Sequence, residues 1–251
     1  MIQAPLGGPI TEIEREEARQ IQQSLLPMGT LQGPSFEIAY RFSPYAGVGG
    51  DFADFFLLPN GQAGLYVGDV VGKGLSAAMY AALVMGTLRG IHKTGEKTGA
   101  ALALLNKRLL VRPVMGRYSA TLYAVFDPLS RILSFSNAGL PLPLLVSESG
   151  CRQLGQGGLP SGLLPAATYE NHSVQLSPGD AVLFATDGLH ELRDRNDRDF
   201  TWEKLAEIWR QCRSQSVEES LGLIFAGARE FSEGGSEQQD DITAVVLKIR
   251  N

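Results

Sequence analysis

The feature that most restricts the fold is the order of the apolar segments along the chain. Strand-like segments follow one another across short turns, and helix-like segments are inserted in pairs. Between Phe36 and Phe42 every second residue is apolar, as in a strand with one buried face. The expected strands are 36–42, 63–69, 118–126, 131–136, 142–146, 173–176, 181–186 and 242–249, and the expected helices are 11–26, 75–93, 99–111, 201–213 and 217–231. This order predicts an α+β fold with helices packed on antiparallel sheet, not a parallel doubly wound fold.

Composition and charge limit the classes of partner. The chain has 251 residues, 44% of them hydrophobic, which is typical of a folded globular protein. Its net charge of −5 argues against nucleic acid and anionic membranes as general partners, because both require a basic surface. Cys151 and Cys212 are far apart in the sequence and provide neither a disulfide framework nor a zinc cluster.

The sequence also predicts a cytoplasmic location. No window approaches 18 uninterrupted apolar residues, the length that a membrane span requires. The first twenty residues carry four glutamates between Glu12 and Glu17, and a signal peptide would not contain them. We therefore expect a soluble protein that does not bind a membrane.

The N-terminal region is expected to differ from the rest of the chain. Residues 1–9 are predicted to be a disordered lead-in, and 10–27 to be a linker or regulatory helix ahead of one domain over 28–251. Thr11 and Glu14 have capping-box spacing, and Pro27 ends the helix. An apolar stripe, which either packs on the domain or pairs with a second copy, consists of Ile10, Ile13, Ala18, Ile21 and Leu25. The Gly- and Pro-rich loop 147–172 is the expected mobile region.

Acidic residues stand at the ends of several apolar strands. They are Asp51, Asp69, Asp187, Asp240 and Asp241. One aspartate at a strand end is usually a turn residue, but several such residues, most with glycine neighbours, indicate a site. Carboxylates without nearby histidine or cysteine favour a hard cation such as Mg²⁺, Mn²⁺ or Ca²⁺.

Other motifs are weaker. Gly49-Gly50-Asp51-Phe52 lacks the acidic fourth residue of the GGDEF signature of diguanylate cyclases. Gly72-x-Gly74-x-x-Ala77 resembles a dinucleotide fingerprint, but no strand with a terminal acidic residue follows about 20 positions later. No nucleophile elbow with histidine and aspartate partners is present, which argues against a serine hydrolase.

Seven blocks taken together resemble the SpoIIE/RsbU group of bacterial PP2C-type serine/threonine phosphatases. They are IQQSLLP (21–27), AGVGGDFADFF (46–56), YVGDVVGKGLSAAM (66–79), LNKRL (105–109), SNAGLPLP (136–143), SPGDAVLFATDGLHE (177–191) and DDIT (240–243). The resemblance implies an α/β/β/α sandwich of two antiparallel sheets flanked by helices. It also implies that 28–251 is a PP2C-like phosphatase domain with two Mn²⁺ or Mg²⁺ ions between the sheets.

The resemblance assigns roles to individual residues. Asp69 matches the aspartate that bridges both metals, and Val70 matches the ligand that uses its backbone carbonyl. Asp187 and Asp240 match ligands of the second metal, and Asp69 and Asp187 are the expected catalytic residues. Asp51 matches the acidic residue of the GGD block. Asp241 is the less favoured neighbour of Asp240, because strand alternation sends the two to opposite sides.

The resemblance also suggests contacts to substrate and a regulatory element. Gly50 and Lys73 are candidate substrate-binding residues, although a solvated lysine is the plainer interpretation of Lys73. Segment 75–90, which follows Asp69, is the expected switch. Its regulatory residues are expected to be Leu75, Ala78, Met79 and Ala82. The plainer interpretation of this segment is a core helix, and it can be both.

The function implied is hydrolysis of phosphoserine or phosphothreonine by a metal-activated water. The expected substrate is an anti-sigma-factor antagonist in a partner-switching pathway, and the N-terminal helix is expected to form a homodimer. The family often has histidine where this chain has Leu140, so a catalytically silent regulatory module is the alternative. A metal-dependent nucleotide cyclase is a third hypothesis, for which no base-reading groups are found.

Overall fold

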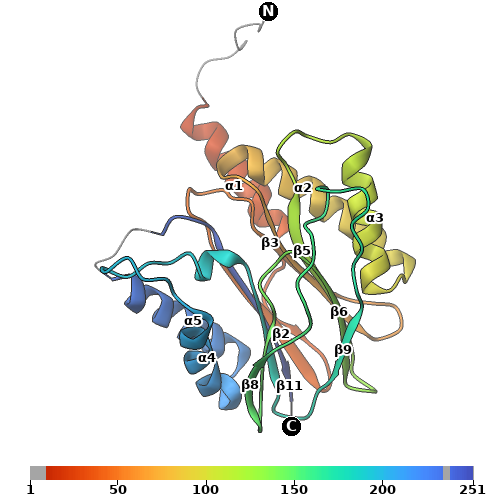
Figure 1. Cartoon of the computed structure of the whole chain (residues 1–251), viewed down its shortest axis with the longest axis vertical. Coiled ribbons are helices and arrows are strands. Elements are labelled where there is room, and N and C mark those ends of the chain that lie inside the picture. The colour runs from red at the N-terminus through yellow and green to blue at the C-terminus, as the bar shows by residue number, and fades with distance from the viewer. Residues whose placement is uncertain (1–9, 234–237, 251) are drawn as a thin grey trace, which may run out of the picture.

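Two antiparallel β-sheets pack face to face and carry helices on both outer sides, as the sequence predicts (Figure 1). The structure, a computed structural model, describes residues 10–233 and 238–250. The predicted lead-in 1–9 lies outside these residues. The first sheet, sheet A, has the strand order β1-β2-β11-β10-β7-β8, and the second, sheet B, has the order β3-β4-β5-β6-β9.

The strands of sheet A come from both halves of the chain. They are β1 (Leu31–Gln32), β2 (Phe36–Ser43), β7 (Leu144–Ser147), β8 (Gly150–Gln153), β10 (Ala181–Ala185) and β11 (Ile242–Ile249). β11 is central: it pairs with β2 from Ile242↔Ser43 to Ile249↔Phe36 and with β10 on its other side. Residues that precede β11 and follow β10 are thereby brought to one end of the sheet.

The strands of sheet B follow one another along the chain. They are β3 (Phe52–Leu57), β4 (Ala63–Val70), β5 (Ser119–Asp127), β6 (Ile132–Ala138) and β9 (His172–Gln175). β3 pairs with β4 from Phe52↔Gly68 to Leu57↔Ala63. The start of β3 and the end of β4 therefore lie side by side, and they hold Asp51 and Asp69.

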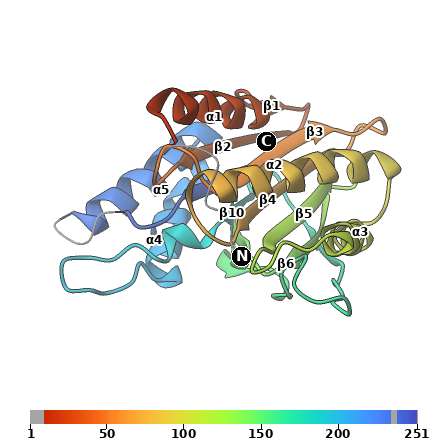
Figure 2. The ribbon, with the colours of Figure 1, turned by 90° about the horizontal axis from the view of Figure 1, so that it is seen from above.

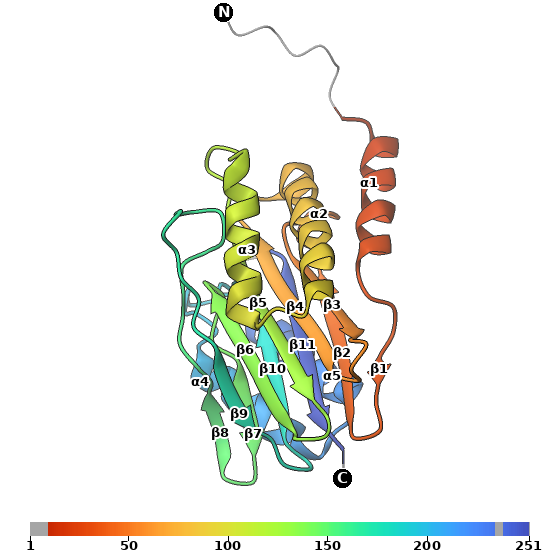
Figure 3. The same cartoon turned by 90° about the vertical axis from the view of Figure 1, so that its right-hand side faces the viewer.

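Three apolar layers hold the sandwich together. The layer between the sheets includes Phe36, Phe126 and Phe184. Helices α4 (Trp202–Gln211) and α5 (Val217–Ser232) cover sheet A around the buried Trp209. Helices α2 (Gly74–Ile91) and α3 (Thr98–Val111) cover sheet B, as Figure 3 shows. The short 3-10 helices are η1 (His92–Thr94), η2 (Asp187–Leu189) and η3 (Cys212–Ser214).

Helix α1 (Glu12–Leu25) lies beside α2 at the edge of the molecule, as the view from above shows (Figure 2). Its start has the predicted capping box, in which the Thr11 hydroxyl accepts from the Glu14 N–H and Glu14 accepts from the Thr11 N–H. The apolar stripe does not face the domain along most of its length, because Ile10, Ile13 and Ile21 are exposed. Buried Gln22 faces inward instead.

Three strands were not expected from the sequence. The segment that forms β3 does not alternate, because both of its faces are covered from Phe52 to Phe55. β1 has two residues and β8 is a largely exposed hairpin arm, so neither carries an apolar pattern. The loop expected to be mobile, 147–172, contains the end of β7 and β8, and Ser161 exchanges two main-chain hydrogen bonds with Ser119.

Among the described residues, one helical segment, Gly74–Thr94, has the length and mean hydropathy of a membrane span. It consists of α2 and η1. The side of α2 that carries Ala77, Tyr80 and Val84 is buried in the layer against sheet B. Its apolar composition therefore agrees with its position as a core helix.

Candidate metal centre

The acidic residues singled out in the sequence meet at one end of the two sheets. Asp51 precedes β3 and Asp69 is the penultimate residue of β4. Asp187 follows β10, and Asp240 and Asp241 precede β11. We call these five residues the carboxylate cluster. Within the described ranges 10–233 and 238–250, no group of three His, Cys, Asp or Glu side chains is arranged closely enough to hold a metal ion.

The cluster carries more negative charge than its surroundings compensate. Burial and the charges of Asp187 and Asp240 raise the pKa of Asp69 to about 7. Burial raises the pKa of Asp51 well above its usual range, and the charges of Asp69 and Asp241 add to this rise. Burial likewise raises the pKa of Asp187 and of Asp241. Adjacent buried carboxylates resist ionisation together, and a cation between them would relieve that cost.

Asp51 is held from sheet A. Its carboxylate accepts a hydrogen bond of 2.7 Å from the hydroxyl of Thr186, at the end of β10. That hydroxyl accepts in turn from the main-chain N–H of Thr243 on β11, at 3.0 Å. The Thr243 hydroxyl is buried and has no hydrogen-bond partner among the residues described. Two threonines thus join Asp51 of sheet B to the facing sheet.

Asp241 holds the loop that leads to Asp51. Its two carboxylate oxygens accept from the main-chain N–H groups of Tyr45 and Gly50, each at 2.8 Å. The contact is close, because a Cβ on Gly49 would stand 1.7 Å from Asp241 Oδ2. Asp241 is buried, whereas Asp240 is half-buried and faces Lys73. The neighbouring pair therefore has two different environments.

Helix α1 holds the same loop from the other side. The Gln22 amide donates to the Gly49 carbonyl at 2.7 Å and accepts from the Gly49 N–H at 3.1 Å. This buried side chain completes the main-chain hydrogen bonding of a residue next to Gly50. Gln22 lies in the IQQSLLP block, but the sequence around it does not indicate which of the two glutamines faces inward.

Two cations lie at the start of α2. Lys73 pairs with Asp240 at 3.1 Å and donates to the Gln239 carbonyl, with its ammonium 5.2 Å from the centre of the Tyr45 ring. Arg117 donates to the Val71 carbonyl and to the Ser76 hydroxyl. Arg117 has no recognisable motif, so the sequence did not identify it. In the described parts of the chain, Lys73 is the one basic side chain that is ion-paired with the carboxylate cluster.

The donor set suits a divalent cation. A Cβ on Gly50 would stand 2.5 Å from the Val70 carbonyl oxygen and 3.1 Å from Asp69 Oδ1, so only glycine leaves the space between these oxygens open. Carbonyl and carboxylate oxygens are the ligands that Mg²⁺ and Mn²⁺ prefer. The pKa values of Asp51 and Asp69 are raised, and a cation bound near them would stabilise their ionised forms.

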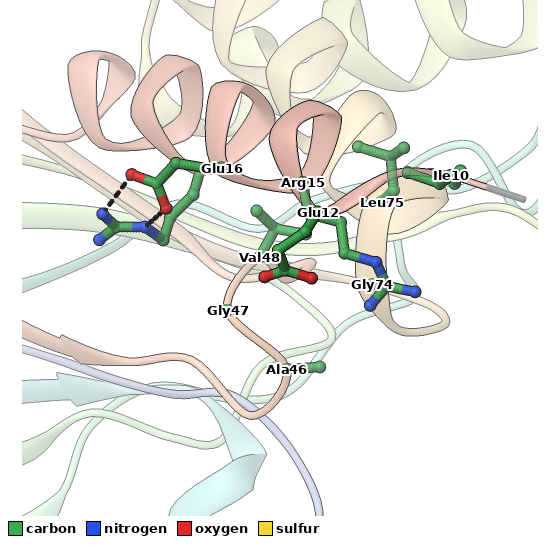
Figure 4. A pocket seen from close by; sticks show the side chains of 10 residues that line it. Ile10, Glu12, Arg15, Glu16, Ala46, Gly47, Val48, Gly74 and Leu75 are labelled. Atoms are coloured by element: carbon green, nitrogen blue, oxygen red, sulfur yellow. Dashed lines mark hydrogen bonds and ion pairs between the residues drawn. The ribbon is translucent and has the colours of Figure 1, made fainter.

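A cavity of about 280 Å³ lies beside the cluster, between α1, the 46–48 loop and the start of α2. Figure 4 shows Arg15 of α1 beside Gly74, with Val48 and Leu75 lining the same space. Of the predicted regulatory residues, Leu75, Ala78 and Ala82 are half-buried and Met79 is exposed. These four residues do not belong to the buried side of α2.

Leu140 and His190 lie in two of the seven sequence blocks, and each has a defined set of contacts in the fold. Leu140 is buried in the layer between the sheets. The side-chain amide of Asn137 accepts a hydrogen bond from the Leu140 N–H and donates one to the Leu140 carbonyl. His190 follows the 3-10 turn η2, and its Nδ1 lies 3.1 Å from the Phe200 carbonyl.

Comparison with known proteins defines the family. The sequence profile of the family described as Stage II sporulation protein E (SpoIIE) matches residues 59–250, which is most of the chain. The chain belongs to the SpoIIE family. In an alignment 273 residues long, it is 28% identical to Protein IcfG of Synechocystis sp.. The alignment covers 95% of this chain and 42% of IcfG. The chain thus spans less than half the length of that relative.

A second relative carries an activity in its name. The phosphoserine phosphatase RsbU of Bacillus subtilis is 22% identical over 237 residues, which cover 94% of this chain and 70% of RsbU. This SpoIIE-family chain is thus similar, over most of its length, to a protein named as a phosphoserine phosphatase.

Solved structures show the same fold. The SiaA-PP2C domain of Pseudomonas aeruginosa superposes with a TM-score of 0.83 at 20% identity, covering 94% of this chain and 95% of that one. The PP2C phosphatase domain of Bacillus subtilis SpoIIE gives 0.73 at 21% identity, covering 86% and 64%. The predicted α/β/β/α sandwich is thus confirmed for this SpoIIE-family domain.

Proposed function

We propose that the domain is an active, metal-dependent phosphatase that hydrolyses phosphoserine or phosphothreonine in a protein. The observation that carries the proposal is the carboxylate cluster, in which five aspartates at strand ends of the two sheets lie within electrostatic reach of one another and Gly50 leaves open the space beside Asp69 and the Val70 carbonyl. Two Mn²⁺ or Mg²⁺ ions are the proposed cofactors. Asp51, Asp69, Asp187, Asp240 and the Val70 carbonyl are the proposed ligands.

The roles of the side chains follow from their surroundings. When bound, the two cations supply a water of lowered pKa and offset charge on the phosphoryl group. Asp69, which is half-buried, and Asp187, which is exposed, would hold these cations. Thr186 fixes Asp51, and Asp241 fixes the Gly49–Gly50 main chain by accepting from Gly50. We assign Asp241 to positioning rather than to ligation.

Lys73 has a proposed role toward substrate. It is 46% exposed at the start of α2 and borders the carboxylate cluster through Asp240. A cation at this place attracts a phosphate to an otherwise acidic surface. The Gly50 main chain, which lies beside Asp69, would bound the space for the phosphoryl group.

The biological setting is proposed from the relatives. We propose a cytoplasmic domain acting on a phosphoprotein of the anti-sigma-factor antagonist type, because RsbU is a phosphoserine phosphatase and another neighbour joins RsbU and RsbW domains. That neighbour, Rv1364c of Mycobacterium tuberculosis, is 26% identical with a TM-score of 0.72, covering 86% of this chain and 60% of that one.

Regulation is proposed to involve the two helices beside the site. The exposed residues Ile13 and Ile21 on α1 suit a homodimer contact. Leu75, Ala78, Met79 and Ala82 lie on the partly exposed side of α2, where movement against α1 would shift Lys73.

The alternative of a silent module depends on the missing histidine at position 140. Leu140 packs between the sheets, so this difference lies in the apolar core and gives no support to a loss of activity.

The test is hydrolysis of p-nitrophenyl phosphate and of a phosphoserine protein, with and without Mn²⁺. We expect turnover only with Mn²⁺, and a loss of about 10³-fold or more in Asp69→Asn. Asp199→Asn is the matched control, because Asp199 is an exposed partner of Arg193 outside the cluster. A folded wild-type protein that binds Mn²⁺ but hydrolyses neither substrate would favour the silent module. Full activity in Asp69→Asn would disprove the assignment.

A further inference from the structure

A second, larger cavity lies at the opposite end of α2 from Lys73. Its volume is about 600 Å³, and it opens on the outer side of sheet B beneath the connection between α2 and α3. Figure 3 shows this connection crossing the sheet near β5. The lining comes from the β3–β4 turn, residues 92–98, β5, β6 and residues 171–173. No member of the carboxylate cluster lines it, and we call it the distal cavity.

The inner wall of the distal cavity holds an unpaired hydroxyl. Tyr123 of β5 lines the cavity and is 2% exposed, yet its hydroxyl makes no hydrogen bond to any residue that the structure describes. Burial raises the pKa of Tyr123 to about 12, so its hydroxyl keeps its proton. Because Tyr123 lines the cavity, its protonated hydroxyl is available to donate a hydrogen bond to a molecule bound there.

His92 also lines this cavity with its imidazole ring. His92 stacks on Phe56 with ring centres 3.7 Å apart, and its Nδ1 is buried with no partner in the described parts of the chain. Burial lowers the pKa of His92, which leaves the ring neutral at pH 7 with one donor and one acceptor. His92 and Tyr123 together offer polar recognition on apolar surroundings, which is typical of small-molecule sites.

The rim of the distal cavity favours an anion. The charged residues in its lining are Lys93, Lys97 and Glu96, so basic residues outnumber acidic ones. Lys97 is also the N-cap of α3, which has no side-chain cap and no acidic residue in its first turn. A helix start of this kind carries partial positive charge. Of the first N–H groups of α3, that of Gly99 is taken by Asn171 at 2.9 Å.

We propose that the distal cavity binds a small phosphate monoester of about mononucleotide size. The phosphate would lie at Lys93, Lys97 and the start of α3, and the body of the ligand would accept from Tyr123 and contact His92. The volume lies within the range of about 300–1,000 Å³ of ligand pockets and greatly exceeds the needs of a free phosphate ion. This binding is independent of the metal centre and of phosphatase activity.

The test is calorimetric titration of the whole protein in EDTA with AMP, ribose 5-phosphate and adenosine. EDTA removes divalent cations, so neither hydrolysis nor phosphate binding at the carboxylate cluster contributes. We expect AMP or ribose 5-phosphate to bind at millimolar concentration or below, and adenosine to bind about tenfold more weakly than AMP. A preference for AMP would identify base recognition, and equal affinity would identify a sugar phosphate.

Substitutions locate the binding. Tyr123→Phe removes one hydroxyl without changing the packing, and Lys97→Gln changes an exposed rim residue, so both variants should fold. Each should weaken binding about fivefold to tenfold. Lys107→Gln is the control, because Lys107 is an exposed lysine of α3 outside the cavity. Absence of binding at about 5 mM of both phosphates, or binding that neither variant weakens, would overturn the proposal.

Discussion

At the scale of single residues, the metal centre depends on main-chain contacts as much as on charge. Gln22 and Asp241 bind opposite sides of the Gly49–Gly50 segment, and both are buried. Neither would touch a metal ion in the proposed arrangement. Both determine where the Asp51 carboxylate lies relative to Asp69.

We predict that Gln22→Ala weakens Mn²⁺ binding without abolishing folding. The substitution leaves the Gly49 N–H and carbonyl unpaired, which costs about 1–3 kcal/mol, and outer contacts of metal sites typically affect affinity by about 10–100-fold. Calorimetric titration with Mn²⁺ measures the change. Gln23→Ala is the matched control, since Gln23 is the exposed neighbour on the same helix. Equal affinities in the two variants would show that Gln22 has no positioning role.

A second prediction concerns pH. The pKa of Asp69 is raised from 3.8 to about 7 in the metal-free fold, so between these values the native state binds more protons than the unfolded state. The free energy of unfolding should therefore fall as the pH rises from about 4 to about 7, by on the order of 3 kcal/mol, and level off above pH 7.

Urea unfolding in EDTA across this pH range measures the fall. Asp69→Asn should reduce it, and saturating Mn²⁺ should remove it because the cation favours the ionised carboxylates. A metal-free wild-type protein whose stability rises from pH 5 to pH 7 would contradict the arrangement of charges described above.

At the scale of elements, α1 depends on α2 for its C-terminal end. The last turn of α1 has no basic residue, and the Leu25 carbonyl accepts from Arg89 of α2 at 2.5 Å. Arg89 also bonds Asp54 at 2.8 Å, and the Tyr66 hydroxyl donates to the same carboxylate at 3.0 Å. One arginine thus joins α1, α2 and β3.

We predict that Arg89→Met destabilises the protein by about 2 kcal/mol. The substitution leaves the Asp54 carboxylate, which is 12% exposed, without its cation. Because Arg89 itself is 37% exposed, solvent screening reduces the loss of stability. Urea unfolding measures the loss. Arg108→Met, at an exposed position of α3, should change the stability by less than about 0.5 kcal/mol. A similar small change in Arg89→Met would show that the network is unimportant for stability.

The elements also show what the sequence can and cannot predict. The start of α1 was predicted because Thr11 and Glu14 bond within one turn. The acidic strand ends were predicted because each stands beside an apolar run. β3 was not predicted, because burial on both faces removes the alternation of its residues. The sequence also did not predict the roles of Gln22, Thr186 and Arg117, because their hydrogen-bond partners lie 27, 135 and 46 positions away.

At the scale of the whole molecule, the exposed face of α1 bears on whether two copies of the chain associate. Ile13 is 73% exposed and Ile21 is 63% exposed. Exposed isoleucines on one helix favour association when a second copy can cover them. The proposed interface is the exposed face of α1 that carries Ile13 and Ile21, whereas Gln22 and Leu25 face the domain.

We predict that the protein is a dimer and that Ile13→Glu/Ile21→Glu makes it a monomer. Light scattering coupled to gel filtration should give about twice the chain mass of 27.1 kDa for the wild type and that mass for the variant. Point substitutions are preferable to removal of residues 1–26, because that deletion would also remove Gln22 and Leu25. Glu17→Gln is the control on the same helix. A monomeric wild type would exclude a stable α1 dimer.

The pairing of β2 with β11 has a consequence for the synthesis of the protein. β2 begins at residue 36, and its neighbour in the sheet is completed only at residue 249. Contacts between such distant segments form slowly, and a nascent chain must wait for them with its apolar strands uncovered. Because β11 also brings Asp240 and Asp241 to the cluster, the ribosome must deliver the chain through β11 before the cluster can assemble. A partly translated chain that lacks β11 therefore has no complete carboxylate cluster.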